Sequence, residues 1–161
     1  MIEIITGSLL DATEKYIVHQ TNCISTGSAA GIAKAIFDKY PYADCYADRK
    51  EPAKPGTIDI RGNGIDKRYV INLCGQNYPG KIVYPKSSTD GVAAREKYFY
   101  HGLLRIAKIS ELESIAINWR IGCGIAGGDW GHYFQMLVNM EKYLNEKYGT
   151  IVRIYRLAGE E

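Results

Sequence analysis

Three polar side chains lie beside two stretches of small residues and could do chemistry there. His19 and Asn22 precede a small-residue run that ends at Gly31, and Asp129 directly follows a glycine-rich run that starts at Gly122. An imidazole with a pKa of about 6.5 can protonate a leaving oxygen or activate a water. A carboxylate can orient or deprotonate a water, and an amide can bind sugar hydroxyls. We therefore take His19, Asn22 and Asp129 as candidate catalytic residues.

Each of these residues also has a structural interpretation. His19 can be a core histidine held by the backbone, because it ends an apolar segment. Asn22 can shape a turn. Asp129 can serve only as the N-cap of the helix that follows it, a role worth about 1 kcal/mol.

Both small-residue stretches are expected to connect a strand to a helix. The first follows a strand at residues 16–20 and leads into a helix at Gly31; the second follows a strand at residues 114–119 and leads into a helix at Asp129. Small residues let backbone N–H groups approach a ligand, and a helix N-terminus adds partial positive charge. The two small-residue stretches together predict two walls around one phosphate-bearing ligand. The alternative is that they form two tight turns without a ligand.

Gly122, Gly124 and Gly127 match the spacing G-x-G-x-x-G, but a nicotinamide-dinucleotide fold is excluded. That motif belongs in the first strand–helix–strand unit, with an acidic residue about 20 positions later. Only 34 residues follow Gly127, enough for one helix and one strand. A Walker A phosphate loop is also missing from the sequence.

The remaining pattern alternates strands and helices, which indicates an α/β fold with three layers and a mixed sheet. In such sheets, ligands bind at the carboxyl ends of the strands. An Asn-Gly pair at residues 63–64 favours a hairpin between two strands. Further strands are expected at residues 1–6, 57–61, 68–72 and 150–157, and a further helix at residues 92–109.

The composition, 46% hydrophobic and 24% charged, is that of a soluble globular chain, and the length fits one domain over residues 1–161. A net charge of +2 disfavours a dedicated nucleic-acid binder. No apolar run reaches the length of a membrane span, and the first residues do not form a signal peptide. The four cysteines lack metal-ligand spacing, so we expect reduced thiols, a cytoplasmic location, and no metal or cofactor.

Taken together, these motifs resemble the macro domain family. The matching segments are VHQTNC at residues 18–23, AGIAKAI at 30–36, YVINLCGQ at 69–76 and IGCGIAGGDW at 121–130. They follow the family order along nearly the whole chain. The sequence is most similar to the branch of yeast-type ADP-ribose 1″-phosphate phosphatases and their bacterial and phage relatives, and the terminal ADP-ribose glycohydrolase branch is second.

The resemblance implies a three-layer α/β/α domain with a mixed sheet of six or seven strands and a cleft for ADP-ribose. It implies that the glycine loop wraps the diphosphate, that the segment around Gly31 forms the opposite wall, and that Asn22 faces the distal ribose. It places Tyr155 near the adenine. The substrate-binding residues that it implies are Leu9, Ala30, Gly31, Ile32, Gly122, Cys123, Gly124, Ile125, Ala126, Gly127, Gly128 and Tyr155.

Two departures from the family pattern bear on function. Ser8 stands where many members have an acidic residue that reads the adenine, and Asp11 is the nearest substitute. The glycohydrolase branch has a catalytic aspartate where this chain has Ala126, and its catalytic lysine has no match near Gln76. A lysine-dependent mechanism is therefore not expected.

The resemblance implies that the chain is a hydrolase that removes phosphate from ADP-ribose 1″-phosphate. Because no metal-ligand set is visible in the sequence, we expect metal-independent chemistry. Two alternatives stay open: a hydrolase that removes ADP-ribose from modified protein or nucleic acid, and a non-catalytic ADP-ribose-binding module. An RNA-binding accessory domain is a weaker alternative. The expected partner is a small-molecule substrate, with ADP-ribosylated macromolecules as a second possibility and no membrane.

Overall fold

The computed structural model describes residues 1–160 and contains one six-stranded sheet. All neighbouring strands are parallel except the last pair, β4 and β3, which is antiparallel, so the sheet is mixed, as predicted. The antiparallel pair is the hairpin that the Asn-Gly signal predicted. Along the sheet the strands are β1 (Glu3–Thr6), β6 (Ile151–Arg156), β5 (Ser114–Asn118), β2 (Tyr16–Asn22), β4 (Tyr69–Gln76) and β3 (Ile58–Arg61).

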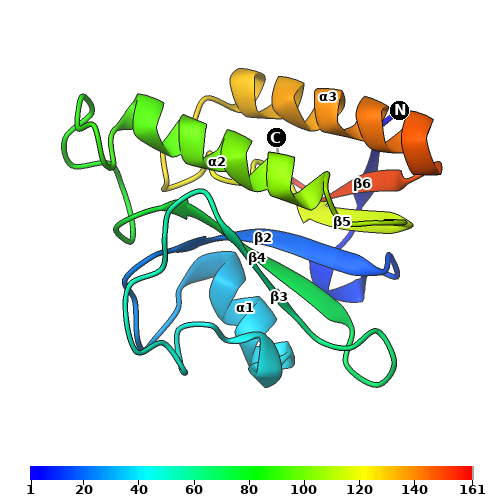
Figure 1. Cartoon of the computed structure of the whole chain (residues 1–161), viewed down its shortest axis with the longest axis horizontal. Coiled ribbons are helices and arrows are strands. Elements are labelled where there is room, and N and C mark those ends of the chain that lie inside the picture. Colours follow the sequence, from blue (N-terminus) through cyan, green and yellow to red (C-terminus); the bar gives the residue numbers. More distant parts are fainter. Residues whose placement is uncertain (161) are drawn as a thin grey trace.

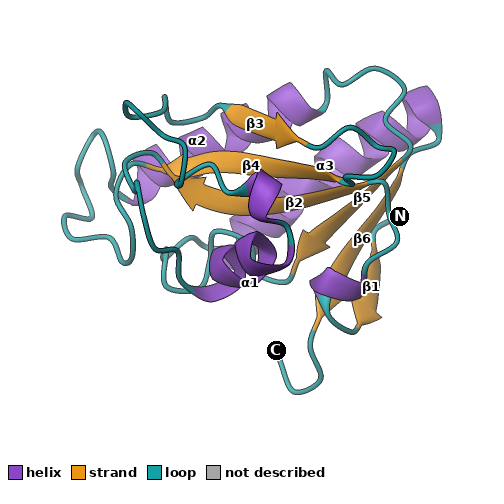
Figure 2. Ribbon diagram, turned by 90° about the horizontal axis from the view of Figure 1, so that it is seen from below, coloured by secondary structure: helices purple, strands orange, loops and turns teal. Residues whose placement is uncertain are grey.

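Helices cover both faces of this sheet, which confirms the three-layer α/β/α prediction (Figures 1 and 2). One face carries α2 (Val92–Ile106) and α3 (Trp130–Tyr148), which lie side by side. The other carries α1 (Gly31–Lys39) and two short 3-10 turns, η1 (Leu9–Asp11) and η2 (Pro41–Ala43). Within the described residues, no helix is both long and apolar enough to span a membrane.

The central strands are apolar along almost their whole length because both of their faces are buried. Side chains on adjacent positions therefore enter different cores. Val18 on β2 faces α2 and α3 in one core, whereas its neighbour Ile17 faces α1 in the other. This alternation decides which side of the sheet each polar residue of β2 reaches.

The parallel strands bring their carboxyl ends to one edge of the sheet. Asn22 at the end of β2 pairs in register with Gln76 at the end of β4. On the other side of β2, β5 ends at Asn118, one position beyond the pair of Ile117 with Val18. The loops that follow β2 and β5 lead into α1 and α3 from this same edge. Asp129 caps α3 as predicted, accepting a hydrogen bond from the His132 amide at 3.2 Å. The two small-residue loops thus emerge side by side.

Candidate functional site

A cavity of about 400 Å³ opens between the two loops at the carboxyl edge of the sheet. This volume is within the roughly 300–1,000 Å³ range of small-molecule sites. The loop before α1 contributes one wall and the glycine loop the other. The predicted residues that line it are Ala30, Gly31, Ile32, Gly122, Gly124, Ile125 and Ala126.

A smaller cavity of about 190 Å³ adjoins the first and shares part of its lining. Gln20, Gln76 and Gly80 line both cavities. Asn22 lines only the smaller one, together with the loop at residues 25–30. The structure therefore places the predicted amide beside the glycine-loop cavity, but in a separate lobe of the cleft.

The glycine loop is held in a compact shape by its own backbone. The Gly128 amide donates to the Gly122 carbonyl at 2.9 Å, and the Gly127 amide donates to the Gly124 carbonyl at 3.1 Å. Gly122 has φ of +72° and Gly127 +81°, a region that favours glycine. Within residues 1–160 the amides of Gly124, Ile125 and Ala126 form no hydrogen bond, so this loop can offer N–H donors to a ligand.

The opposite wall also carries amides that have no hydrogen-bond partner among the described residues. The first helical hydrogen bond of α1 joins the Lys34 amide to the Ala30 carbonyl at 3.3 Å. The preceding amides therefore have no partner within the helix, as at any helix N-terminus. Ala30 makes no side-chain cap that could satisfy them. Two sets of amides thus lie on opposite sides of the main cavity, an arrangement suited to phosphate.

Two glutamines form the floor of the cleft, and the sequence interpretation missed both. Gln20 donates through Nε2 to Oε1 of Gln76 at 2.8 Å, and Gln76 donates to the Tyr78 carbonyl at 2.8 Å. Gly75 makes room for Gln20, since a Cβ there would lie 2.2 Å from the Gln20 Oε1 atom. The available signal was that each glutamine lies at or near the end of a buried parallel strand. Asn118, Trp119, Arg120, Gly80 and Glu160 are further lining residues that were not predicted.

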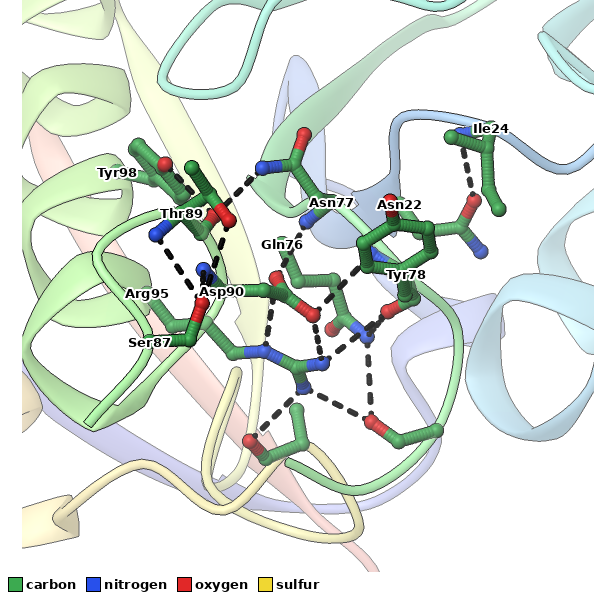
Figure 3. Close-up of polar contacts among 12 residues, drawn as sticks. Asn22, Ile24, Gln76, Asn77, Tyr78, Ser87, Thr89, Asp90, Arg95 and Tyr98 are labelled. Atoms are coloured by element: carbon green, nitrogen blue, oxygen red, sulfur yellow. Dashed lines mark hydrogen bonds and ion pairs between the residues drawn. The ribbon is translucent and has the colours of Figure 1, made fainter. Parts of the chain in front are cut away.

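Asn22 combines the structural role considered for it with a place in the cleft. Its Oδ1 accepts a hydrogen bond from the Ile24 amide at 3.0 Å (Figure 3). The same oxygen accepts from the Ser25 amide at 2.8 Å. Its own backbone amide donates to the Tyr46 hydroxyl at 2.9 Å. The side-chain oxygen is therefore engaged in shaping the loop, and the Nδ2 group is the part left to contact a ligand.

His19 lies away from the cleft, so the structure does not support the catalytic role expected of it. Its side chain is fully buried on the α1 side of β2, edge-on to the Phe37 ring. Its Nε2 lies 2.5 Å from Oδ1 of Asn72, whose Nδ2 donates to the Ala43 carbonyl at 2.9 Å. Burial lowers the pKa of His19 to about 4, although the Asn72 contact opposes this. The core-histidine interpretation fits this geometry.

Asp129 does not line either cavity, although it directly follows the glycine loop. Its side chain is 58% exposed, and one carboxylate oxygen caps α3. The other oxygen lies 4.0 Å from Nε2 of His132, whose Nδ1 lies 2.9 Å from Glu96. The N-cap role is thus present, and the oxygen that faces His132 is also accessible to solvent at the end of the loop.

Four other predicted substrate contacts are not among the cavity residues. Leu9 is in the α1-side core, and Cys123 is buried, which raises the pKa of its thiol to about 12. Gly127 and Gly128 shape the loop from behind: a Cβ on Gly127 would meet Ile82, and one on Gly128 would lie 2.7 Å from the Tyr133 ring. These residues support the cleft without forming its surface.

Tyr155, expected near an adenine, lines neither of the two cavities. The hydroxyl donates to Oε1 of Glu14 at 2.6 Å, and Glu14 is fully buried. Ser8, at the position of the family's acidic residue, caps η1 by accepting from the Leu10 amide at 3.1 Å. Within residues 1–160, no group of three or more His, Cys, Asp or Glu side chains is placed to hold a metal.

Fold and cleft together define an α/β/α domain with one ligand site between two strand-to-helix loops. The fold is that of macrodomains. The chain is similar to the macrodomain of Mycobacterium tuberculosis DarG, with a TM-score of 0.72, 23% identity, and 96% of this chain and 97% of that chain covered. It is also similar to the macrodomain of Thermus aquaticus DarG, with a TM-score of 0.68, 23% identity, and coverage of 97% and 98%.

A third similar structure is the Trypanosoma brucei macrodomain in complex with ADP-ribose, with a TM-score of 0.66 and 17% identity, covering 97% of this chain and 63% of that chain. At these identities the similarity establishes the fold. No protein-family model matches the sequence, and no curated protein matches it.

Proposed function

We propose that the main cavity binds ADP-ribose, with the diphosphate between the glycine loop and the start of α1. The observation that carries this proposal is the pair of opposed amide sets around one cavity of about 400 Å³. Uncharged N–H donors on both sides suit a diphosphate, which presents acceptor oxygens in two directions. The shared fold with a macrodomain solved in complex with ADP-ribose supports the same ligand.

The distal ribose would occupy the smaller cavity, beside Asn22. The Nδ2 group of Asn22 can donate to a ribose hydroxyl while its Oδ1 holds the loop. Gln20 and Gln76 would lie beneath the junction of the diphosphate and this ribose, because each glutamine lines the main cavity and the smaller one. This orientation is part of the proposal.

We propose hydrolysis of ADP-ribose 1″-phosphate as the activity of this site. Ala30 and Ile32 at the start of α1 line both cavities, so amides of this segment border the smaller cavity as well as the diphosphate. Amides beside a phosphate lower the cost of the charge that develops during phosphoryl transfer to water. With His19 in the core, Asp129 is the remaining candidate for orienting that water, because its exposed carboxylate directly follows the glycine loop. Removal of ADP-ribose from modified protein or nucleic acid, and binding without turnover, are the alternatives.

A matched pair of charge substitutions tests the binding site. Ile32 is partly exposed on the cavity wall, whereas Leu104 is comparably exposed on α2 outside the cleft. Ile32→Glu places a negative charge against the diphosphate and is expected to weaken ADP-ribose binding at least tenfold in calorimetry. Leu104→Glu is expected to bind like the wild type. Absence of wild-type binding, or equal binding by both variants, would refute the proposed site.

The activity is tested by incubating the wild type with ADP-ribose 1″-phosphate and measuring free phosphate. Release of phosphate supports the phosphatase. Release of ADP-ribose from modified protein or DNA, without phosphate release, would assign the second alternative instead. Tight binding with neither product over hours would assign a binding module.

A further inference from the structure

One arginine behind the cleft connects the two segments that line the end of the main cavity. Arg95, near the start of α2, is fully buried. Its Nη1 donates to the Gly80 carbonyl at 2.8 Å and to the Ala126 carbonyl at 3.1 Å (Figure 3). Its Nη2 donates to the Tyr78 carbonyl at 3.2 Å. A single guanidinium thus joins the segment after β4 to the glycine loop.

Asp90 neutralises this arginine and fixes its direction. The Arg95 Nη2 lies 2.7 Å from Oδ2 of Asp90, and Nε lies 3.2 Å from Oδ1. Asp90 also accepts a hydrogen bond from the Asn77 amide at 2.7 Å. A buried ion pair is retained at low cost only when its remaining donors and acceptors are satisfied, and here the carbonyls of both segments satisfy them.

Both segments whose carbonyls accept hydrogen bonds from Arg95 reach the ligand cavity directly. Gly80 and Ala126 line the cavity of about 400 Å³ from separate parts of the chain. Gln76, on the cavity floor, donates to the same Tyr78 carbonyl that receives Arg95. The side chain of Ile82 lies against Gly127, so the two segments also pack on each other. The distance between the segment at residues 78–80 and the glycine loop therefore depends on the Arg95 guanidinium that joins them.

We propose that Arg95 is a positioning residue for the ligand site: it sets the distance between the segment at residues 78–80 and the glycine loop, so that the free amides of the loop face the cavity. This inference rests on the proposed ADP-ribose function. Arg95 itself lines neither the main nor the smaller cavity. Arginine suits the role because its planar fork offers five donors in fixed directions, whereas a lysine ammonium is a point charge with three.

The test compares Arg95→Lys with Arg68→Lys. Arg68 makes a similar type of contact, donating to the carbonyls of Ala12 and Glu14, but it precedes β4 at the opposite edge of the sheet from the cleft. We expect R95K to weaken ADP-ribose binding at least tenfold and R68K to change it less than twofold. Thermal unfolding of both variants shows how much stability each loses.

Hydrogen exchange supplies the readout that a merely structural role would not move. R95K is expected to speed exchange at the hydrogen-bonded amides of both segments together, at least tenfold, with the centre of α2 unchanged. These are the amides of Asn77 and Tyr78 in one segment and of Gly127 and Gly128 in the other. Exchange that rises evenly over α2 and the sheet would show general loosening and overturn the proposal. Wild-type affinity and exchange in R95K would overturn it as well.

A second variant covers the case in which R95K does not fold. The double substitution Asp90→Asn with Arg95→Gln removes both buried charges and keeps amide groups at both positions. We expect it to fold and to show the same joint increase in exchange; wild-type exchange in both segments would refute the positioning role. If the wild-type protein binds no ADP-ribose, the proposed function fails, while the exchange comparison still decides the role of Arg95.

Discussion

Gly122 lies so close to Gln20 that a Cβ atom on the glycine would be 2.7 Å from Oε1 of the glutamine. The same Cβ would lie 2.7 Å from the ring of Tyr133. Gly122→Ala must therefore displace the cleft floor, and the positive φ adds about 1–2 kcal/mol of backbone strain. We expect lower stability in denaturant unfolding and at least tenfold weaker binding of ADP-ribose.

Gly124→Ala is the control for that substitution. No atom lies within 4 Å of a Cβ placed there, and its φ is not positive. Its free energy of unfolding is expected to change by less than about 0.5 kcal/mol. If G122A and G124A prove equally stable, the close approach of Gly122 to Gln20 does not constrain the cleft.

His19 makes the stability of the protein depend on pH between about 4 and 6.5. Its folded pKa of about 4 lies below the ordinary value of 6.5, so the unfolded chain takes up a proton first as the pH falls. The stabilisation is complete above pH 6.5 and is lost toward pH 4, by up to about 3 kcal/mol. His19→Gln should flatten the curve of unfolding free energy against pH over this range.

Two controls accompany the pH experiment. Gln135→Ala, at an exposed position of α3 without a titrating side chain, should leave the slope of the wild type unchanged. ADP-ribose affinity of H19Q should stay within twofold, because His19 does not line the cleft. A large loss of affinity in a folded H19Q protein would return the histidine to the ligand site.

Substitutions can separate the two roles of Asp129, the capping of α3 and the proposed orientation of a water. Asp129→Asn keeps an oxygen that caps α3 and should leave stability unchanged, while Asp129→Ala should cost about 1 kcal/mol. If the carboxylate orients the attacking water, D129N should slow phosphate release about a hundredfold. Asp44→Asn is the control, since Asp44 also accepts from backbone amides, outside the cleft. A full rate in D129N would leave only the capping role.

Tyr155→Phe should reduce stability without affecting the ligand. The substitution removes the donor to Glu14, whose side chain is 1% exposed. Among residues 1–160, Arg153 is then the one side-chain partner that Glu14 keeps. Loss of a hydrogen bond to a buried carboxylate costs about 1.5–3 kcal/mol. Thermal unfolding measures the loss, and Tyr100→Phe at an exposed site serves as the control. Weaker ADP-ribose binding by Y155F would instead place the hydroxyl at the ligand.

The elements were predictable because their apolar periodicity and glycine boundaries are local signals. The strand at residues 114–119 and the helix that Asp129 caps were both located within a residue or two. β4 was predicted to end at Asn72 but continues to Gln76. Small and polar residues there resemble a loop, and only the tertiary structure shows that Gly75 is needed to accommodate Gln20.

The walls of the site were predictable, but its floor and its support were not. The glycine loop and the residues around Gly31 carry their own conformational signal. No such local signal tells whether His19 or Gln20 faces the cleft. Adjacent strand residues face opposite layers, and the sequence does not show which layer borders the cleft. Arg95 was missed because its partners are backbone carbonyls distant in the sequence. Every residue has a backbone carbonyl, so the residue types do not indicate which ones an arginine contacts.

The order of the strands sets a limit on how early the sheet can form during synthesis. β1 pairs with β6, and no other strand in the described residues contacts β1 as a ladder partner. During synthesis, residues 3–6 therefore have no strand partner until residues 151–156 have left the ribosome. Pairings of such long sequence separation also slow folding, because closure of the chain precedes the contacts that favour it. The loops of the cleft can assemble around β2, β4 and β5 before this final edge is added.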